Sequence, residues 1–311
     1  MFDIVGKRYW YFLLSALVLV PGLIALLLWG LNLSIDFTGG ALLELQFQNP
    51  AKVLQPAEIT SQLSEIGYPG SLAQSSSDNV VLIRTKALTQ DEKNTIEHAL
   101  ETTYGPFVEN RFESVGPSVG EAVTQRAVYA VAMAAVGILL YLAFAFRHVP
   151  NPFRYGTAAI LAMLHDVFVV LGLAALAGHF LHWEVDALFL TALLTVIGFS
   201  VHDTIVVFDR IRENMRRHRG EPFADIVNHS IIQTLDRSIN TQLTALFTLV
   251  ALSLFGGVTI KQFVLWLIIG IVSGTYSSIF NASQILVVWE NKEYERFLPF
   301  LRRGEQKQVA A

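Results

Sequence analysis

Apolar residues gather in six long runs along the chain, and these runs predict six membrane-spanning helices. A spanning helix needs roughly 20 mostly apolar residues. The first run is longer than the roughly 7–15 apolar residues of a signal peptide, so we interpret it as an uncleaved anchor. The runs cover about residues 9–30, 127–146, 156–177, 185–208, 240–255 and 263–288.

Composition and charge then set the orientation of these spans. Of the 311 residues, 53% are hydrophobic and 15% are charged, whereas soluble domains carry about 25% charge. Lys and Arg concentrate before the first run, between the second and third, between the fourth and fifth, and after the sixth. Cytoplasmic loops carry such an excess, so we expect both termini in the cytoplasm. The expected parts are the N-terminus with the first span (1–31), an outer domain (32–126), five further spans (127–288) and a cytoplasmic tail (289–311).

The outer segment predicts a small α+β domain. Thr89 and Glu92 match a capping box at the start of one helix. Residues 74–79 are a polar connector that could close a further strand. The order β-α-β-α-β suggests a ferredoxin-like split domain. Strands are expected at 41–48, 80–85 and 107–115, and helices at 56–67 and 89–104.

Three of the predicted spans carry ionisable side chains, which are costly in a membrane and are therefore functional candidates. Asp166 lies about ten residues into the third run, roughly 15 Å deep, beside His165. Asp203 lies in the cytoplasmic half of the fourth run, next to His202, and Arg237 opens the fifth. A structural role stays open for Asp166, and Arg237 could instead fix topology or contact lipid headgroups.

Small and polar residues repeat at helical spacing in the last three spans, and we expect these stripes to face the bundle interior. Gly270 and Gly274 also form a GxxxG pair, which permits close helix approach. Simple packing is the alternative explanation for the stripes. They consist of Thr191, Thr195, Gly198, His202 and Asp209; of Arg237, Thr241, Thr244 and Thr248; and of Gly270, Gly274, Ser277 and Asn281.

Two further segments have weaker signals. Residues 223–235 have an apolar face and predict an interfacial amphipathic helix. His179, His182 and Glu184 lie close together in an outer loop, where a metal site and an ordinary hydrated loop are the two interpretations. The sequence contains no cysteine, which excludes disulfides and thiolate metal sites. The apolar face consists of Phe223, Ile226, Val227, Ile231 and Leu235.

Three strings are specific enough to indicate a family. The chain contains IDFTGG at residues 35–40, GFSVHDTIVVFDRIREN at 198–214 and TLDRSINT at 234–241. Together with six spans and one large outer domain, they resemble the SecF side of the SecD/SecF family of bacterial protein-export subunits. That family is related to the resistance-nodulation-division transporters. The resemblance covers nearly the whole chain.

The resemblance implies a fold of two pseudo-symmetric six-helix halves in the bacterial inner membrane, one half from SecD and one from this chain. It implies that proton flow moves the periplasmic domains, which help an unfolded preprotein to emerge from the SecYEG channel. The proton is then the coupling ion, and no catalytic residue, metal or other cofactor is expected.

The resemblance also assigns residues. The family's membrane carboxylate falls on Asp203 and its arginine on Arg237, so protonating Asp203 would free Arg237. Relatives often have Asn where this chain has His202, which leaves open whether that imidazole joins the proton path. The other candidate members of an accessory path are Asp166, His165 and Thr241.

The turn after the first run has two interpretations. Gly39 and Gly40 permit backbone conformations that other residues avoid, and Asp36 can cap a turn. Together with Phe37 and Thr38 they would form a firm joint to the outer domain. The sharper hypothesis is that this joint is a hinge that transmits motion.

Three other functions stay open at this stage. A half-subunit of a proton-driven small-molecule exporter would also need a partner half. An intramembrane aspartyl protease would use Asp166 and Asp203, but the sequence has no Gly-x-Gly-Asp string, and a nearby arginine would hinder a shared proton. A scaffold subunit would have no proton role at all.

Overall fold

The computed structural model describes residues 2–48, 50, 52–77, 79–147 and 151–293, and the chain divides into two compact units. The helical unit comprises the chain up to Asn32, Val131–Trp183 and the chain from Leu188 onward. The sheet unit comprises Leu33–Ala130 and Glu184–Ala187. The predicted outer domain therefore corresponds to the sheet unit, which also includes four residues from the outer loop between the third and fourth spans.

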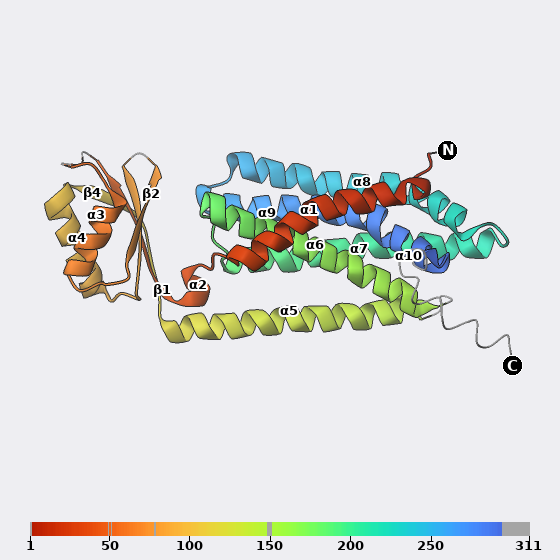
Figure 1. Cartoon of the computed structure of the whole chain (residues 1–311), viewed down its shortest axis with the longest axis horizontal. Coiled ribbons are helices and arrows are strands. Elements are labelled where there is room, and N and C mark those ends of the chain that lie inside the picture. Colours follow the sequence, from red (N-terminus) through yellow and green to blue (C-terminus); the bar gives the residue numbers. More distant parts are fainter. Residues whose placement is uncertain (1, 49, 51, 78, 148–150, 294–311) are drawn as a thin grey trace. The chain divides into compact units, whose positions relative to one another are not determined.

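Long helices build the helical unit, and they lie side by side in Figure 1. Over the described residues, six segments are long and apolar enough to cross a membrane, which confirms the predicted spans. The sixth contains a π-helical turn, η2, between α9 and α10. The elements are η1 (Val5–Lys7), α1 (Arg8–Trp29), α5 (Pro117–Ala145), α6 (Pro152–Leu181), α7 (Ala187–Arg217), α8 (Phe223–Phe255), α9 (Val258–Ser277), η2 (Ser278–Ala282) and α10 (Ser283–Glu290).

The expected interfacial helix at residues 223–235 is wrong as a separate element. This segment is the first part of α8, which continues without a break to Phe255. Ile226, Val227 and Ile231 of its apolar face are buried inside the protein. An apolar face that packs on neighbouring helices has the same sequence pattern as one that lies on lipid, so periodicity alone did not separate the two.

The sheet unit is a four-stranded antiparallel sheet with order β2-β3-β1-β4, and α3 and α4 cover one face (Figure 1). This order and the sequence β-α-β-β-α-β are those of the predicted ferredoxin-like fold. The elements are α2 (Ile35–Thr38), β1 (Gly40–Phe47), α3 (Pro56–Glu65), β2 (Leu72–Ser77), β3 (Val80–Thr85), α4 (Gln90–Tyr104) and β4 (Phe107–Val115).

The covered face of the sheet holds the core of this unit. Leu43 and Leu45 of β1 are fully buried against residues of α3 and α4. The capping box at the start of α4 is confirmed, since Thr89 accepts a hydrogen bond from the Glu92 backbone and the Glu92 carboxylate accepts one from the Thr89 N–H at 2.9 Å. That backbone bond, with further bonds from Thr89 and Lys86, holds the pKa of Glu92 below its usual value.

Residues 74–77 of the expected connector belong to an edge strand, β2, which pairs with β3 alone among the described strands. Its Leu72 is 58% exposed, and the rest of the strand is small or polar. Because this edge strand contributes little to the core, its sequence lacks the apolar alternation that reveals a half-buried strand.

A pair of leucine substitutions tests the position of this core. Leu43→Ala removes a fully buried side chain and should lower the free energy of unfolding of the sheet unit by about 2–5 kcal/mol. Leu72→Ala removes an exposed one and should change that free energy by less than about 0.5 kcal/mol. Pulse proteolysis across a denaturant series, with cleavage sites in the sheet unit as readout, measures both. Equal losses in the two variants would place the core on the other face.

Candidate functional site

Small residues bring α9 close to α7, and this contact sets up the first buried acid site. A Cβ atom on Gly274 would lie 3.3 Å from the Cα of Ser200, and one on Gly270 would overlap Val196. Larger side chains would therefore push the helices apart. The predicted GxxxG pair is thus at a helix contact, and it carries the neighbouring serines of α9 toward α6.

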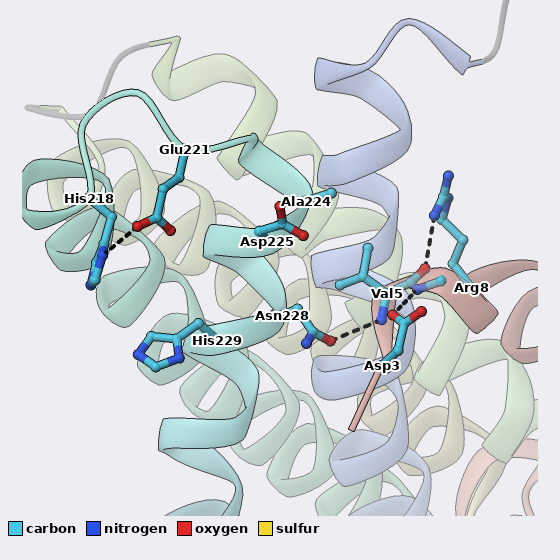
Figure 2. Close-up of a pocket in the computed structure, with 10 residues that line it drawn as sticks. Asp3, Val5, Arg8, His218, Glu221, Ala224, Asp225, Asn228 and His229 are labelled. Atoms are coloured by element: carbon cyan, nitrogen blue, oxygen red, sulfur yellow. Dashed lines mark hydrogen bonds and ion pairs between the residues drawn. The ribbon is translucent and has the colours of Figure 1, made fainter. Parts of the chain in front are cut away.

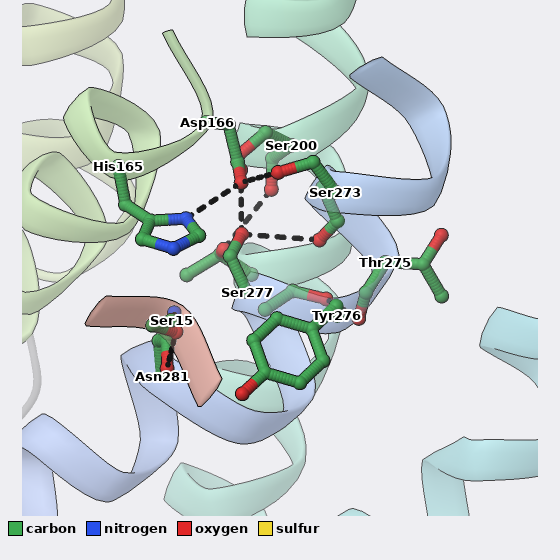
Figure 3. Close-up of polar contacts among 12 residues, drawn as sticks. Ser15, His165, Asp166, Ser200, Ser273, Thr275, Tyr276, Ser277 and Asn281 are labelled. Carbon is green, nitrogen blue, oxygen red and sulfur yellow. Dashed lines mark hydrogen bonds and ion pairs between the residues drawn. The ribbon is translucent and has the colours of Figure 1, made fainter. Parts of the chain in front are cut away.

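Asp166 of α6 lies at the centre of a polar cluster that joins three helices (Figure 3). Its side chain is fully buried. Ser200 of α7 donates to Asp166 Oδ2 at 2.6 Å, Ser273 of α9 donates to Oδ1 at 2.7 Å, and Ser277 of α9 also donates to Oδ2. The Nδ1 atom of His165 lies 3.1 Å from Oδ1. Every contact comes from a different turn or helix, so the cluster ties α6, α7 and α9 together.

Asp203 occupies a second buried site, one turn further along α7. Its side chain is 2% exposed, and Gln242 of α8 donates a hydrogen bond from Nε2 to Asp203 Oδ2 at 2.5 Å. Ser238 and Thr234, which precede Gln242 at helical spacing, are also buried. The polar face of α8 that packs inward is therefore the one with Thr234, Ser238 and Gln242.

Arg237 lies on a different face of α8 from Gln242. Five residues separate the two, which turns them apart by roughly 140° around the helix axis. Arg237 is exposed, and over the described residues no ion pair joins it to Asp203. The pairing of these two residues is thus untested by this arrangement and stays a prediction.

The expected interior position of the polar stripes is confirmed for α9, and for α7 and α8 it stays a prediction. In α9 and η2, the four stripe residues are buried. In α8 and α7 the stripes lie on exposed faces of this single chain, because an adjacent face of each helix packs against the other helices. The exposed stripe residues are Arg237, Thr241, Thr244 and Thr248 of α8, and Thr191, Gly198, His202 and Asp209 of α7.

The residues that hold the two acids were largely missed from the sequence. Gln242, Ser200 and Ser273 are uncharged, and polar residues without charge are common enough in spans to draw little attention. The available signal was spacing. Ser200 lies three residues before Asp203 on α7, and Ser273 and Ser277 are one turn apart on α9.

The two acids do not form the dyad that a protease would need. Asp166 bonds to serines of α7 and α9, whereas Asp203 bonds to an amide of α8, and no hydrogen bond joins the two carboxyls within the described ranges. The outer-loop residues are also dispersed. His179 stacks on Trp29 with ring centroids 4.0 Å apart, and Glu184 forms an ion pair with Arg84 in the sheet unit.

The turn that opens the sheet unit is built from the predicted joint residues. The Asp36 carboxylate accepts a hydrogen bond at 3.0 Å from the N–H of Ala187, the first residue of α7. Thr38 donates to the Ser34 carbonyl at 3.0 Å. Gly39 has a φ of 70° and leaves room for Pro117, whose Cα would lie 3.0 Å from an added Cβ.

A polar pocket lies where the start of the chain meets the α7–α8 connection (Figure 2). Asn228 of α8 accepts hydrogen bonds from the N–H groups of Ile4 and Val5 at 2.9 and 3.2 Å. Nearby, His218 and Glu221 are 3.0 Å apart. The backbone bonds anchor the N-terminal segment to α8, so this pocket has a structural explanation.

Comparisons with known proteins agree with this arrangement. The family described as "Protein export membrane protein SecD/SecF, C-terminal" matches residues 95–292, and "SecD/SecF GG Motif" matches residues 29–51. The chain is 52% identical to the protein translocase subunit SecF of Thermobaculum terrenum, with 100% of both chains covered. It is 46% identical to the SecF subunit of Anaerolinea thermophila, covering 96% of this chain and 97% of the relative.

A solved structure extends the likeness to the fold. The crystal structure of SecDF, a translocon-associated membrane protein from Thermus thermophilus, superposes with a TM-score of 0.80 at 34% identity. The match covers 93% of this chain and 39% of that one. This chain therefore spans about two fifths of the length of the solved SecDF.

The fold and the buried acids define a multi-pass helical membrane protein with a ferredoxin-like domain between its first two spans. The chain belongs to the SecF group of the SecD/SecF family of protein-export membrane proteins. As a translocase subunit it is a transport protein rather than a catalytic enzyme, and membership of this group places it in the bacterial cytoplasmic membrane.

Substitution of Gln242 tests the second acid site. Gln242→Leu leaves the buried Asp203 without its observed donor, which should lower the free energy of unfolding by about 1–3 kcal/mol. Thr241→Ala is the matched control, because Thr241 is the exposed neighbour on the same helix. Thermal unfolding of the two variants in detergent micelles measures the difference. A Gln242→Leu midpoint equal to that of the control would show that Asp203 finds another partner.

Proposed function

We propose that this chain is one half of a proton-driven motor that works with SecD in protein export. In this proposal the proton motive force drives movements of the sheet unit, which promote late steps of preprotein transfer through SecYEG. The observation that carries the proposal is Asp203, a carboxyl that is 2% exposed inside a predicted span. Such a group is costly inside a membrane span, so its presence indicates a function.

The exposed stripes of α7 and α8 support a second half. Arg237, Thr241 and His202 are exposed in the single chain, although they lie on spans. Charged residues in spans almost always face a bundle interior or a water-filled cavity. A partner half that covers this face would supply that interior, and the solved SecDF, of which this chain covers 39%, has room for one.

The proposed orientation places both termini in the cytoplasm and the sheet unit in the periplasm. Its support is the distribution of Lys and Arg, which cluster in the segments at one side of the spans. The connection between α7 and α8 and the end of α7 are rich in arginine, with Arg210, Arg212, Arg216, Arg217 and Arg219 in a short stretch.

The proposed cycle exchanges the partner of Asp203. In the described arrangement a neutral amide, Gln242, donates to this carboxyl. When the proton leaves, the charged carboxylate needs a cation, and Arg237 is the one Lys or Arg residue of α8. Since the two α8 residues are turned apart by roughly 140°, the exchange requires α8 to rotate or the partner half to reposition it. That rotation is the two-state element of the cycle.

The energy scale of this cycle is adequate. One charge that crosses 100 mV releases ~2.3 kcal/mol. Moving a two-state equilibrium from 1:99 to 99:1 needs ~5.5 kcal/mol. A few protons per cycle therefore suffice to switch the helices almost completely.

The joint residues give a route from α7 to the sheet unit. Asp36 caps the first residue of α7, and the Ser34 N–H bonds to the Val185 carbonyl at 2.9 Å. The ion pair between Arg84 of β3 and Glu184, which precedes α7, adds a third contact within the sheet unit. Because α7 also carries Asp203, a change at that carboxyl has a continuous helix along which to act on the joint.

Asp203→Asn tests the proton role. The amide is close in shape but does not titrate, so proton-driven stimulation of export should be abolished while the protein still assembles with SecD. Asp209→Asn is the matched control, since Asp209 lies on the same helix with its carboxylate paired to Arg212 at the surface. Export into inverted membrane vesicles, with and without a proton gradient, measures both. Normal stimulation in Asp203→Asn would remove the proton role and favour a scaffold.

Asp36→Ala tests the joint. Loss of the carboxylate removes the hydrogen bond that Asp36 accepts from the Ala187 N–H, and an N-cap of this kind stabilises a helix by about 0.5–2 kcal/mol. We expect weaker export stimulation with Asp203 still titrating. Asp36→Asn keeps an acceptor oxygen and should retain most of the stimulation. If Asp36→Ala exports as well as the unmodified chain, the joint does not transmit motion.

A further inference from the structure

The proposed cycle leaves one fully buried acid unused, and its surroundings suit a charged carboxylate. Asp166 accepts hydrogen bonds from the hydroxyls of Ser200, Ser273 and Ser277. An ionised carboxylate only accepts hydrogen bonds, whereas a protonated one must also donate. The three hydroxyls that converge on the two oxygens can all donate to the ionised form, so the cluster accommodates a charged carboxylate.

A charge buried in a span needs a counter-charge nearby. Within the part of the chain that the structure describes, the ion-pair partner of Asp166 is His165, at 3.1 Å. The other titratable groups that face the pair are neutral or acidic. Tyr276 of α9 has its ring centroid 6.5 Å from that of His165 and donates its hydroxyl to the Tyr11 carbonyl of α1, and Asp203 lies one turn further along α7.

The two nitrogens of His165 have different surroundings. Nδ1 faces the carboxylate, while Nε2 is buried and lacks a hydrogen-bond partner among the described residues. The imidazole also lines a groove between α1, α6 and α9, together with Leu14, Ser15 and Ser273. The groove gives Nε2 a side of approach that does not pass through Asp166.

We propose that His165 and Asp166 form a second proton-binding site in this chain, distinct from Asp203. With the proton bound, both nitrogens of His165 carry hydrogen and the imidazolium faces an ionised Asp166. Release takes the proton from Nε2, and a neutral imidazole that still donates from Nδ1 remains. No other bond forms or breaks. The proton site stands on this geometry, and only its part in transport rests on the proposed function.

The site is placed to act on the same helix as Asp203. Ser200, which donates to Asp166, lies three residues before Asp203, about 4.5 Å along α7. On one side α7 is bonded to α6 and α9 through Asp166, and on the next turn it is bonded to α8 through Gln242. Loss of the His165 proton leaves Asp166 without a counter-charge, so the carboxylate then depends more on its serine donors from α7 and α9. The two sites therefore hold adjacent turns of α7 against different neighbouring helices.

Nitrogen NMR of the purified complex with SecD, labelled with ¹⁵N-histidine, tests the site without measuring transport. The chain has eight histidines, and His165→Gln identifies the signal that belongs to His165. We expect that signal to change from that of an imidazolium to that of a neutral imidazole when one proton is removed. In Asp166→Asn the midpoint should fall by at least about one pH unit, because the counter-charge is gone.

Two further variants make the outcome decisive. Ser273→Ala removes one hydrogen-bond donor from Asp166 and leaves the carboxylate more dependent on the imidazolium. The midpoint of the His165 signal should therefore rise in this variant. This measurement is available even where Asp166→Asn fails to fold. His182→Gln, in an exposed position at the end of α6, is the matched control and should leave the His165 signal unchanged. A His165 signal that does not titrate, or one whose midpoint is the same in both Asp166→Asn and Ser273→Ala, overturns the proposal.

Export assays distinguish the proposed His165–Asp166 site from the proposed role of Asp203. In His165→Gln, the part of the pH dependence of proton-driven export that follows the His165 signal should disappear, while the part that depends on Asp203 remains. If Asp203→Asn exports normally while His165 still titrates, the proposed function fails and the proton site stands. If Asp203→Asn is inactive and His165 does not titrate, the proposed function stands and the second site is wrong.

Discussion

The structure depends on one constraint, which is that an acid inside a membrane-spanning helix must find its hydrogen bonds within the protein. Neither Asp166 nor Asp203 has more than 2% of its side chain exposed, and lipid offers no polar partner. Three serines donate hydrogen bonds to Asp166, and one glutamine donates a hydrogen bond to Asp203. The helix contacts that place these donors are therefore as important as the acids themselves. Gly274, which lets α9 approach Ser200, belongs to the site although it touches no carboxylate.

The same constraint explains the exposed polar faces of α7 and α8. The hydroxyls of Thr241, Thr244 and Thr248 donate to carbonyls of their own helix, whereas Arg237 is a charge exposed on a span. The apolar exterior of a self-sufficient bundle would look different, with polar residues gathered inside. The buried cluster around Asp166 and the exposed polar face around Arg237 differ in this way, and the proposed partner half would cover the second.

The sequence was informative wherever a pattern had a single physical explanation. Long apolar runs imply spans, and the Thr89–Glu92 pair implies a helix start, so both predictions are confirmed. Patterns with two explanations were not resolved. The face with Ile226 and Ile231 fits lipid or protein equally well, and protein contact proved correct. The strand at Leu72 has no buried side to impose alternation, so it looked like a connector.

The candidate site shows the same division. The acids were found because charge in a span is rare, but their donors were not, since a hydroxyl or an amide carries no comparable signal. The sequence did not show which face of α8 packs against α7. A stripe that begins at Arg237 and one that ends at Gln242 are both helical, and only tertiary packing decides which of them faces Asp203.

The course of α7 explains how these parts can act together. Its first N–H is capped by Asp36 of the joint, its middle carries Ser200 and Asp203, and its end carries the arginine-rich segment. A helix is stiff along its axis because each turn is bonded to the next. A shift of α7 that breaks one of its contacts therefore also changes its other contacts. In the proposed cycle, proton binding at Asp203 would change which neighbours hold this helix. The joint lies at its first residue, so in that proposal the change would reach the sheet unit through the Asp36–Ala187 hydrogen bond.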